Sequence, residues 1–167
     1  MKIPIQVEPA TNGTPSVDYR WDPDTEILSA QLNPRSSGVG MSGSVEVEGS
    51  DGSWLILDVT SGRINGVEVA VWPDVHTRTA LAPPKGVTDA AVLVPSRKSK
   101  SDLTALEVET PVSAEADESE RVFHFTLGRS KAARTVRFAR DILIDVDSSN
   151  NLAGLWLLNV PPFPSQT

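Results

Sequence analysis

The chain contains no cysteine and only two histidines, His76 and His124. The lack of cysteine excludes disulfide bonds, zinc–thiolate sites, iron–sulfur clusters and a thiol nucleophile. Neither histidine has a second metal-ligating side chain at the usual sequence spacing, so we expect no metal and no other cofactor. The nucleophile motifs G-x-S-x-G and S-x-x-K are missing as well. The sequence therefore predicts a protein that is not an enzyme.

Basic residues and long hydrophobic runs are also scarce. The chain has 15 Lys and Arg against 22 Asp and Glu, a formal net charge of −7. An acidic surface repels a phosphate backbone, so we expect no direct binding to nucleic acid. No hydrophobic run approaches membrane-spanning length, and Pro4 and Gln6 interrupt the apolar stretch that a signal peptide would need. These features predict a cytoplasmic protein without membrane contact.

The dominant pattern in the sequence is alternation of apolar and polar residues. It occurs at residues 3–7, 17–21 and 45–48, among others. A period of two is typical of β-strands, and Pro23 presets a tight turn that leads into the strand predicted at 27–32. Only residues 113–121 suggest a helix. The predicted fold class is therefore all-β with little helix.

Segments of the first half of the chain can be aligned with segments of the second half. The aligned pairs are 27–32 with 122–127, 44–47 with 135–138, and 55–73 with 142–161. In this alignment Asp58 matches Asp145, and Gly66 matches Gly154. We therefore predict two β-rich repeats. The predicted divisions are 1–75 for the first repeat, 76–117 for a connecting segment with extra strands, and 118–167 for the second repeat.

The predicted hairpins carry apolar side chains on both faces. In the first repeat Leu55 and Leu57 lie on one face, and Trp54 and Ile56 on the other. A sheet with two apolar faces must be covered on both. We therefore expect the two repeats to pack as a pseudo-symmetric sandwich or barrel, with residues 73–121 covering an outer face.

Three motifs give the chain a resemblance to a known family. They are WDPDTEIL at 21–28, SVEV at 44–47 and LDVTSGRINGVEV at 57–69, and the second copy follows them with VFHFTL, TVRF and ILIDVDSSNNLAGLWLL. This pattern resembles the small bacterial family catalogued as domain of unknown function 2283. The resemblance implies β-rich domains without established catalysis that act in toxin–antitoxin or similar two-gene modules. The second copy departs from the pattern because it lacks the turn at 21–24 and has Leu155-Trp156 where the first has Glu68.

Aspartate and glycine residues mark both predicted hairpins. Asp58 and Asp145 each precede a turn, where an aspartate commonly accepts hydrogen bonds from backbone amides. Gly66 and Gly154 follow at the matching bends, so we interpret all four as structural turn residues. An alternative stays open in which Asp58, Asp145 and Asp147 hold the divalent cation of a metal-dependent hydrolase.

Charged and aromatic residues suggest a contact surface. The candidate residues for a partner or ligand surface are Glu46, Glu48, Glu68, Trp72, Glu107, Glu109 and Trp156. The leading hypothesis is a non-enzymatic protein-recognition module, such as an antitoxin, an immunity protein or a subunit of a bacterial defence system. Its acidic face would oppose a basic surface on the partner protein. The alternative is a small-ligand or carbohydrate-binding β-sandwich that uses an exposed Trp72 or Trp156. The sequence leaves open whether the protein is a monomer or a homo-oligomer.

Overall fold

The computed structural model describes residues 3–10, 13–33, 43–95 and 106–164. Within these ranges every regular element is a β-strand and there is no helix, which confirms the prediction of an all-β protein. The strands are β1 (Gln6–Pro9), β2 (Ser16–Trp21), β3 (Leu28–Asn33), β4 (Gly43–Glu48), β5 (Trp54–Thr60), β6 (Arg63–Val71), β7 (Val75–Thr77), β8 (Thr88–Leu93), β9 (Leu106–Glu109), β10 (Val112–Ala116), β11 (Phe123–Leu127), β12 (Arg134–Ala139), β13 (Ile142–Val146) and β14 (Leu152–Leu157).

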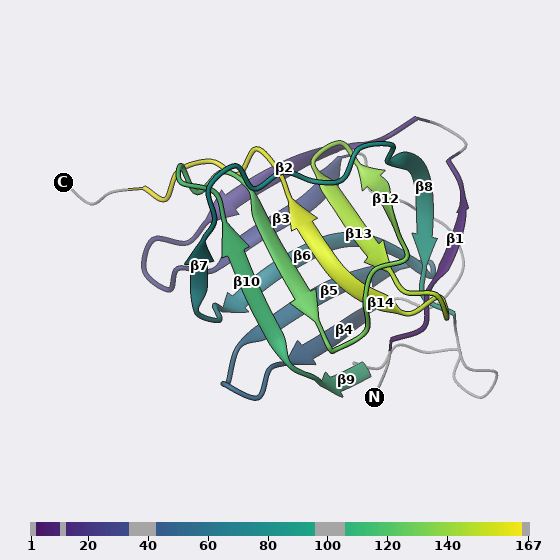
Figure 1. Ribbon diagram of the computed structural model, residues 1–167, viewed down its shortest axis with the longest axis horizontal. Coiled ribbons are helices and arrows are strands. Elements are labelled where there is room, and N and C mark those ends of the chain that lie inside the picture. Colours follow the sequence, from purple (N-terminus) through teal and green to yellow (C-terminus); the bar gives the residue numbers. More distant parts are fainter. Residues whose placement is uncertain (1–2, 11–12, 34–42, 96–105, 165–167) are drawn as a thin grey trace.

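The strands form one curled sheet. Its order is β7-β10-β11-β14-β13-β12-β8-β6-β5-β4-β9, with β3 and β2 attached beside β6 and β1 beside β8. The sheet curls into a half-barrel, so that β10, β11, β14 and β13 lie as one layer over β3, β6, β5 and β4 (Figure 1). Strand β8 connects the two layers, since it pairs in parallel with β12 and also contacts β6.

The aligned segments of the two halves take equivalent places in the sheet. Strands β3, β6, β5 and β4 pair in the same order as β11, β14, β13 and β12. Asp58 lies opposite Gly66, and Asp145 lies opposite Gly154. The last strand of each set takes a parallel neighbour, β9 beside β4 and β8 beside β12. Each half of the chain therefore supplies one layer of the half-barrel.

The main core lies between the two layers. Strand β5 shows the expected alternation, with Leu55, Leu57 and Val59 buried and the residues between them more exposed. Strands β13 and β14 are buried along their whole length. The reason is a second apolar cluster outside the sheet, in which Leu81 packs with Leu143. Residues of the connecting segment therefore cover the outer face of the second half, whereas the outer face of β5 leaves Trp54 39% exposed.

The prediction of a helix at residues 113–121 is wrong. Residues up to Ala116 form β10, in which Ala114 and Ala116 are buried in the core. A turn follows, because the Asp117 carboxylate accepts hydrogen bonds from the amides of Arg121 at 2.8 Å and Val122 at 3.0 Å. Among the described residues, no helix is long and apolar enough to cross a membrane.

Candidate functional site

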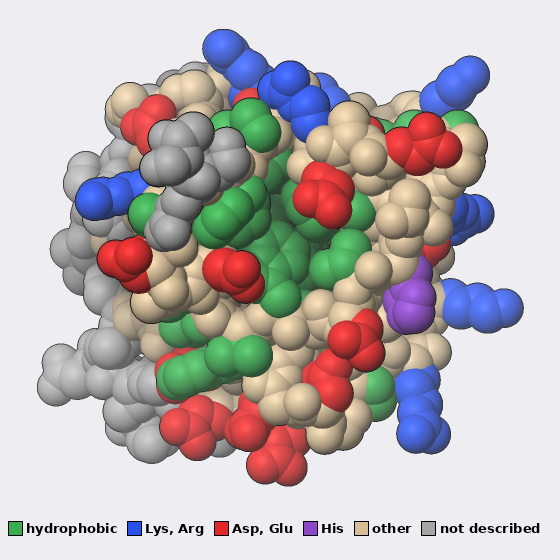
Figure 2. Space-filling view, turned by 90° about the vertical axis from the view of Figure 1, so that its left-hand side faces the viewer, with side chains coloured by type: hydrophobic (Ala, Val, Ile, Leu, Met, Phe, Trp, Pro, Cys, Tyr) green, Lys and Arg blue, Asp and Glu red, His purple; other side chains and the backbone are tan. Residues whose placement is uncertain are grey.

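A pocket opens at the end of the half-barrel where the β2–β3 and β10–β11 turns lie near the C-terminal segment. Its volume is about 520 Å³. Figure 2 shows this face as a hollow lined with hydrophobic side chains, with acidic side chains around it. The residues that line the pocket are Trp21, Glu26, Trp72, Val75, Ser119, Glu120, Phe123, Pro162 and Phe163.

The walls of the pocket are aromatic. Trp21 and Trp72 are stacked with their ring centroids 5.6 Å apart and an interplanar angle of 18°. Phe163 packs edge-on against Trp21 at 5.1 Å, and Phe123 lies 5.1 Å from Trp72. Aromatic pairs in these geometries are favourable beyond the area they bury. The four rings therefore support one another as a connected wall.

Both indole groups of the wall are anchored by hydrogen bonds to the backbone. Trp21 Nε1 donates to the carbonyl of Pro161, and Trp72 Nε1 donates to the carbonyl of Glu26, each at 2.8 Å. The first bond ties the C-terminal segment to β2, and the second ties the end of β6 to the β2–β3 turn. The orientation of each indole is therefore fixed before any ligand arrives.

Two turns with the same closing hydrogen bond frame the mouth of the pocket, at residues 22–27 and 117–122. In each, the amide of the first aspartate donates to the carbonyl of the last residue, at 2.9 and 3.1 Å. Glu26 and Glu120 have φ angles of 63° and 56°, a left-handed conformation that is uncommon for residues other than glycine. The second half lacks the Trp-Asp-Pro motif of the first. It nevertheless forms a turn that begins with an aspartate at the equivalent place.

The first aspartate of each turn stabilises it. Hydrogen bonds from the Asp24 amide and the Thr25 side chain lower the pKa of Asp22 below its ordinary value. Burial opposes ionisation of Asp117, but hydrogen bonds from the Val122 amide and the Ser119 hydroxyl outweigh it and lower the pKa of that carboxyl too. Both aspartates are therefore committed to their own turns, and the glutamates that follow them line the pocket.

The pocket offers negative charge but few hydrogen-bond donors. Glu26 and Glu120 are exposed, and neither side chain forms a hydrogen bond or an ion pair in the described part of the chain. The side-chain donors of the lining are already engaged, since both indole N–H groups bind carbonyls and the Ser119 hydroxyl donates to Asp117 at 2.8 Å. The polar groups left free on the lining side chains are two carboxylates.

A separate acidic face lies on the outside of β4 and β9. The parallel pairing sets Glu46 beside Glu107 and Glu48 beside Glu109. Trp54 is exposed next to them and lines a depression of about 270 Å³ together with three of these glutamates. Like charges on directly neighbouring strands repel. This arrangement brings together four of the residues that the sequence predicts for a contact surface, and we call it the acidic face.

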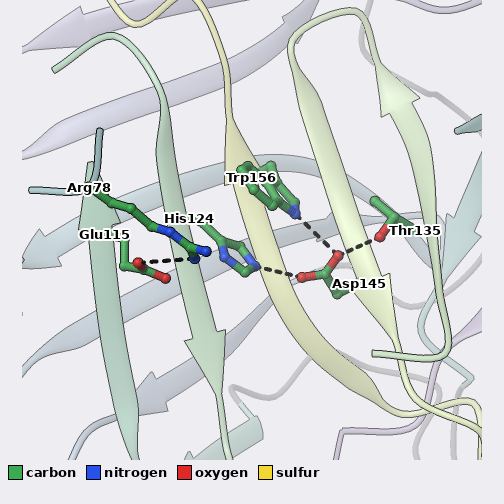
Figure 3. A network of polar contacts seen from close by, with 6 residues as sticks. All are labelled: Arg78, Glu115, His124, Thr135, Asp145 and Trp156. Atoms are coloured by element: carbon green, nitrogen blue, oxygen red, sulfur yellow. Dashed lines mark hydrogen bonds and ion pairs between the residues drawn. The ribbon is translucent and has the colours of Figure 1, made fainter. Parts of the chain in front are cut away.

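A third polar cluster lies on the outer surface of the second layer (Figure 3). The Asp145 carboxylate lies 2.7 Å from His124 Nε2 and accepts hydrogen bonds from the Thr135 hydroxyl at 2.6 Å and from Trp156 Nε1 at 3.2 Å. The imidazole of His124 also stacks on the Trp156 ring at 3.9 Å. Burial of Asp145 opposes ionisation, but hydrogen bonds from His124 and Thr135 outweigh it and lower its pKa.

Hydrogen bonds between the side chains of this cluster connect neighbouring strands on the outer surface of the second layer. Each Asp145 oxygen is engaged, and an ion pair of Arg78 with Glu115 at 3.4 Å closes the cluster on the β10 side. The equivalent outward positions of the first half carry other groups, with Ser29 in place of His124 and its hydroxyl 3.4 Å from Glu68. In the second half the cluster positions Trp156 under the connecting segment.

Of the two predicted turn aspartates, Asp145 has different partners from those expected. Asp147, not Asp145, accepts the turn amides, from Ser149 and Asn151 at 2.9 Å each. Asp145 instead binds side chains, because it points out of the sheet two residues before the turn. Asp58 lies in the other layer, and no cluster of three potential metal ligands is found within the described residues. The three aspartates are thus not brought together as the hydrolase alternative requires.

The other residues predicted for a contact surface do not lie at one site. Trp72 lines the pocket, whereas Trp156 is 5% exposed and is covered by His124 and Leu81, so it does not provide the open surface expected. Glu68 lies apart, half-buried beside Ser29. Sequence reasoning missed most of the pocket. The available signal was the aspartate-led turn that precedes the first strand of each aligned set.

Comparisons with known proteins leave the chain without an assigned family. No protein-family model matches it, and no curated protein matches it. The resemblance to domain of unknown function 2283 therefore stays a prediction.

Proposed function

We propose that the protein is a non-enzymatic recognition module that binds a small ligand in the aromatic pocket. The observation that carries this proposal is the connected wall of four aromatic rings around a pocket of about 520 Å³. Ligand sites typically have volumes of about 300–1,000 Å³, apolar linings and a few polar groups that set orientation.

The fixed orientation of the walls supports binding. Trp21 and Trp72 are held by backbone hydrogen bonds as well as by their mutual stacking. A site that is already ordered loses little conformational entropy when a ligand enters. The two indoles therefore provide a preformed surface against which an apolar group can pack.

A variant at Phe163 tests this proposal with little risk to the fold. Phe163 is 39% exposed and contacts the pocket from its C-terminal side. In a ligand screen on the full chain, followed by NMR of the indole N–H groups, we expect a binding ligand to shift the signals of Trp21 and Trp72. Phe163→Ala should weaken that binding about tenfold, because half of a phenylalanine contact is lost. Trp54, which lies on the acidic face, is the internal control.

The proposal fails if a broad panel of apolar, cationic and sugar ligands leaves the pocket signals unchanged. It also fails if Phe163→Ala binds the selected ligand as well as the unmodified protein does.

The acidic face favours a second candidate function, recognition of a partner protein with a basic surface, as in an antitoxin, immunity protein or defence-system subunit. Its support is the pairing of Glu46 with Glu107 and of Glu48 with Glu109 beside the exposed Trp54. A basic partner would relieve the repulsion between the paired carboxylates, and tryptophan is a frequent anchor of protein interfaces.

Charge-neutralising variants separate this second function from the first. Replacing all four paired glutamates of the acidic face by glutamine should abolish capture of a basic partner from cell lysate at low salt. A matched variant with glutamine at Glu8, Glu26, Glu118 and Glu120 removes the same charge elsewhere and should retain capture. Equal loss in both variants would show a general charge effect and contradict a specific face.

A further inference from the structure

Within the described part of the chain, the two carboxylates at the mouth of the pocket have no partner to balance their charge. Glu26 and Glu120 come from equivalent turns of the two halves, and both line the same pocket. Neither forms an ion pair or a side-chain hydrogen bond among the residues described. Both also hold a left-handed backbone conformation. Such a conformation is unfavourable for a residue other than glycine and persists where the surrounding structure fixes it, frequently at ligand sites.

The free groups of the pocket select among ligand classes. A sugar or another neutral polar ligand needs both donors and acceptors from its site. Here the side-chain donors are already used, by the indole N–H groups and by Ser119. The lining side chains therefore offer an incoming molecule aromatic surface and negative charge.

A methylated ammonium group matches this combination. It carries a positive charge on an apolar surface and does not need hydrogen-bond acceptors to satisfy several N–H donors. Aromatic side chains bind such cations through their ring electrons as well as by contact, and quaternary ammonium groups are common ligands of aromatic sites. Nearby carboxylates add attraction that a neutral ligand of the same shape would not receive.

We infer that the pocket binds a free small organic cation, in which a methylated ammonium group lies against the tryptophan wall and between the Glu26 and Glu120 carboxylates. This inference rests on the proposed function, because it names the ligand class of the same pocket. It is independent of the acidic face, which shares no lining residue with the pocket.

A pair of isosteres tests the role of charge in the unmodified protein. Choline and its neutral counterpart 3,3-dimethylbutan-1-ol differ in a nitrogen and a carbon atom at the centre of the methylated group. NMR titration of the full chain should show choline shifting the indole signals of Trp21 and Trp72 but not that of Trp54. We expect choline to bind more tightly than the alcohol by about fivefold for each carboxylate, the effect of one unit charge at contact distance in water.

Variants assign the charge effect to the two glutamates. Glu26→Gln combined with Glu120→Gln should lower choline affinity about 25-fold and leave the affinity of the neutral alcohol within about twofold. The matched control is Glu118→Gln, in the same turn as Glu120, because Glu118 binds the Thr79 hydroxyl and does not line the pocket. This control should bind choline like the unmodified protein.

The outcomes distinguish the inference from the function on which it rests. If choline and the alcohol bind the pocket equally, the inference is overturned while ligand binding in the pocket stands. If methyl glucoside shifts the pocket signals and choline does not, the ligand class is wrong. If choline shifts only Trp54, cations gather at the acidic face and the inference is overturned as well. If neither isostere nor any other ligand reaches the pocket, both proposals fail.

Discussion

Gly154 lies directly opposite Asp145 in the β13–β14 pair, and the Asp145 carboxylate occupies the space that a side chain at position 154 would need. A Cβ atom at Gly154 would collide with this carboxylate and would also lie 2.9 Å from the carbonyl oxygen of Phe125. At the aligned Gly66, the closest atoms are the Ala30 carbonyl oxygen and the end of the flexible Gln31 side chain, both at 3.0 Å. The two glycines are thus equivalent in register but differ in what they make room for.

This difference predicts unequal effects of alanine. Gly154→Ala should lower the free energy of unfolding by roughly 2–3 kcal/mol, because buried overpacking cannot relax without moving Asp145. Gly66→Ala should have a smaller effect, since the Gln31 side chain can move aside. Denaturant unfolding of both variants measures the difference. Equal effects would show that the carboxylate does not determine the glycine requirement.

The pKa of Asp145 predicts a pH-dependent contribution to stability. Folding lowers this pKa below its ordinary value of 3.8, so the ionised carboxylate stabilises the fold above that pH, and the contribution is lost as the pH falls through the lower pKa of the folded state. Asp145→Asn should therefore destabilise the protein by about 1–3 kcal/mol at neutral pH and by less in strong acid. Urea unfolding of both proteins at several pH values gives this difference. Asp74→Asn, at an exposed position, is the control. An offset between Asp145→Asn and the unmodified protein that stays constant with pH would contradict the prediction.

Tyr19 predicts a delayed alkaline titration. It is the single tyrosine of the chain, and its hydroxyl donates to the carbonyl of Leu158 at 2.8 Å. Burial, reinforced by the charge of Asp141, raises its pKa far above the ordinary value of 10.0. Phenolate absorbance should therefore appear only when the protein unfolds in alkali, as followed by circular dichroism. Normal titration in the folded protein would place this side chain in solvent.

A phenylalanine variant measures the hydrogen bond itself. Tyr19→Phe keeps the ring and removes the hydroxyl that connects β2 to the residues after β14. We expect a loss of about 1 kcal/mol in the free energy of unfolding. Ser16 is in the same strand as Tyr19, and its exposed hydroxyl donates a hydrogen bond to the Asn33 carbonyl. Ser16→Ala should change stability by less than about 0.5 kcal/mol. Similar losses in both variants would show that the connection to the C-terminal segment adds nothing.

The contact of Leu81 with the sheet holds the connecting segment in place, and a variant can test how much it stabilises the fold. Its side chain is buried against Leu143 and Trp156. Leu81→Ala should cost about 2 kcal/mol and expose the Trp156 indole, which would shift the tryptophan fluorescence to longer wavelength. Pro84→Ala, at an exposed position of the same segment, is the control and should leave both properties nearly unchanged. An unshifted spectrum in Leu81→Ala would mean that this segment does not shield the indole.

The strands and the outward direction of Glu46 and Glu48 were predictable because they depend on local pattern. Alternation at residues such as Val45 and Val47 fixes which side chains face the core, and therefore that Glu46 and Glu48 face outward. The alignment matches Asp58 with Asp145 and Gly66 with Gly154, and in the structure each aspartate lies opposite its glycine. That β9 would pair with β4, and so complete the acidic face, depends on tertiary packing.

The other sites depend on the curl of the sheet and were not predictable. His124 and Asp145 meet because β14 lies between their two strands, a neighbour relation that sequence spacing does not reveal. The pocket requires the β2–β3 and β10–β11 turns to meet at one end of the molecule. Residues 113–121 do not form the expected helix, because tertiary packing extends the residues up to Ala116 as a strand in which Ala114 and Ala116 fill the core.

The order in which the two layers are synthesised has a consequence for folding. The inner face of the first layer, formed by β3 to β6, is covered by strands that follow β8 in the sequence. On the ribosome, the first half must therefore emerge with Leu57 and its buried neighbours still open to solvent. Contacts between segments that are distant in the sequence form late and slowly. Until these contacts form, the exposed apolar strands bind chaperones or one another. The nascent chain should depend on chaperones most strongly just before β11 to β14 are released.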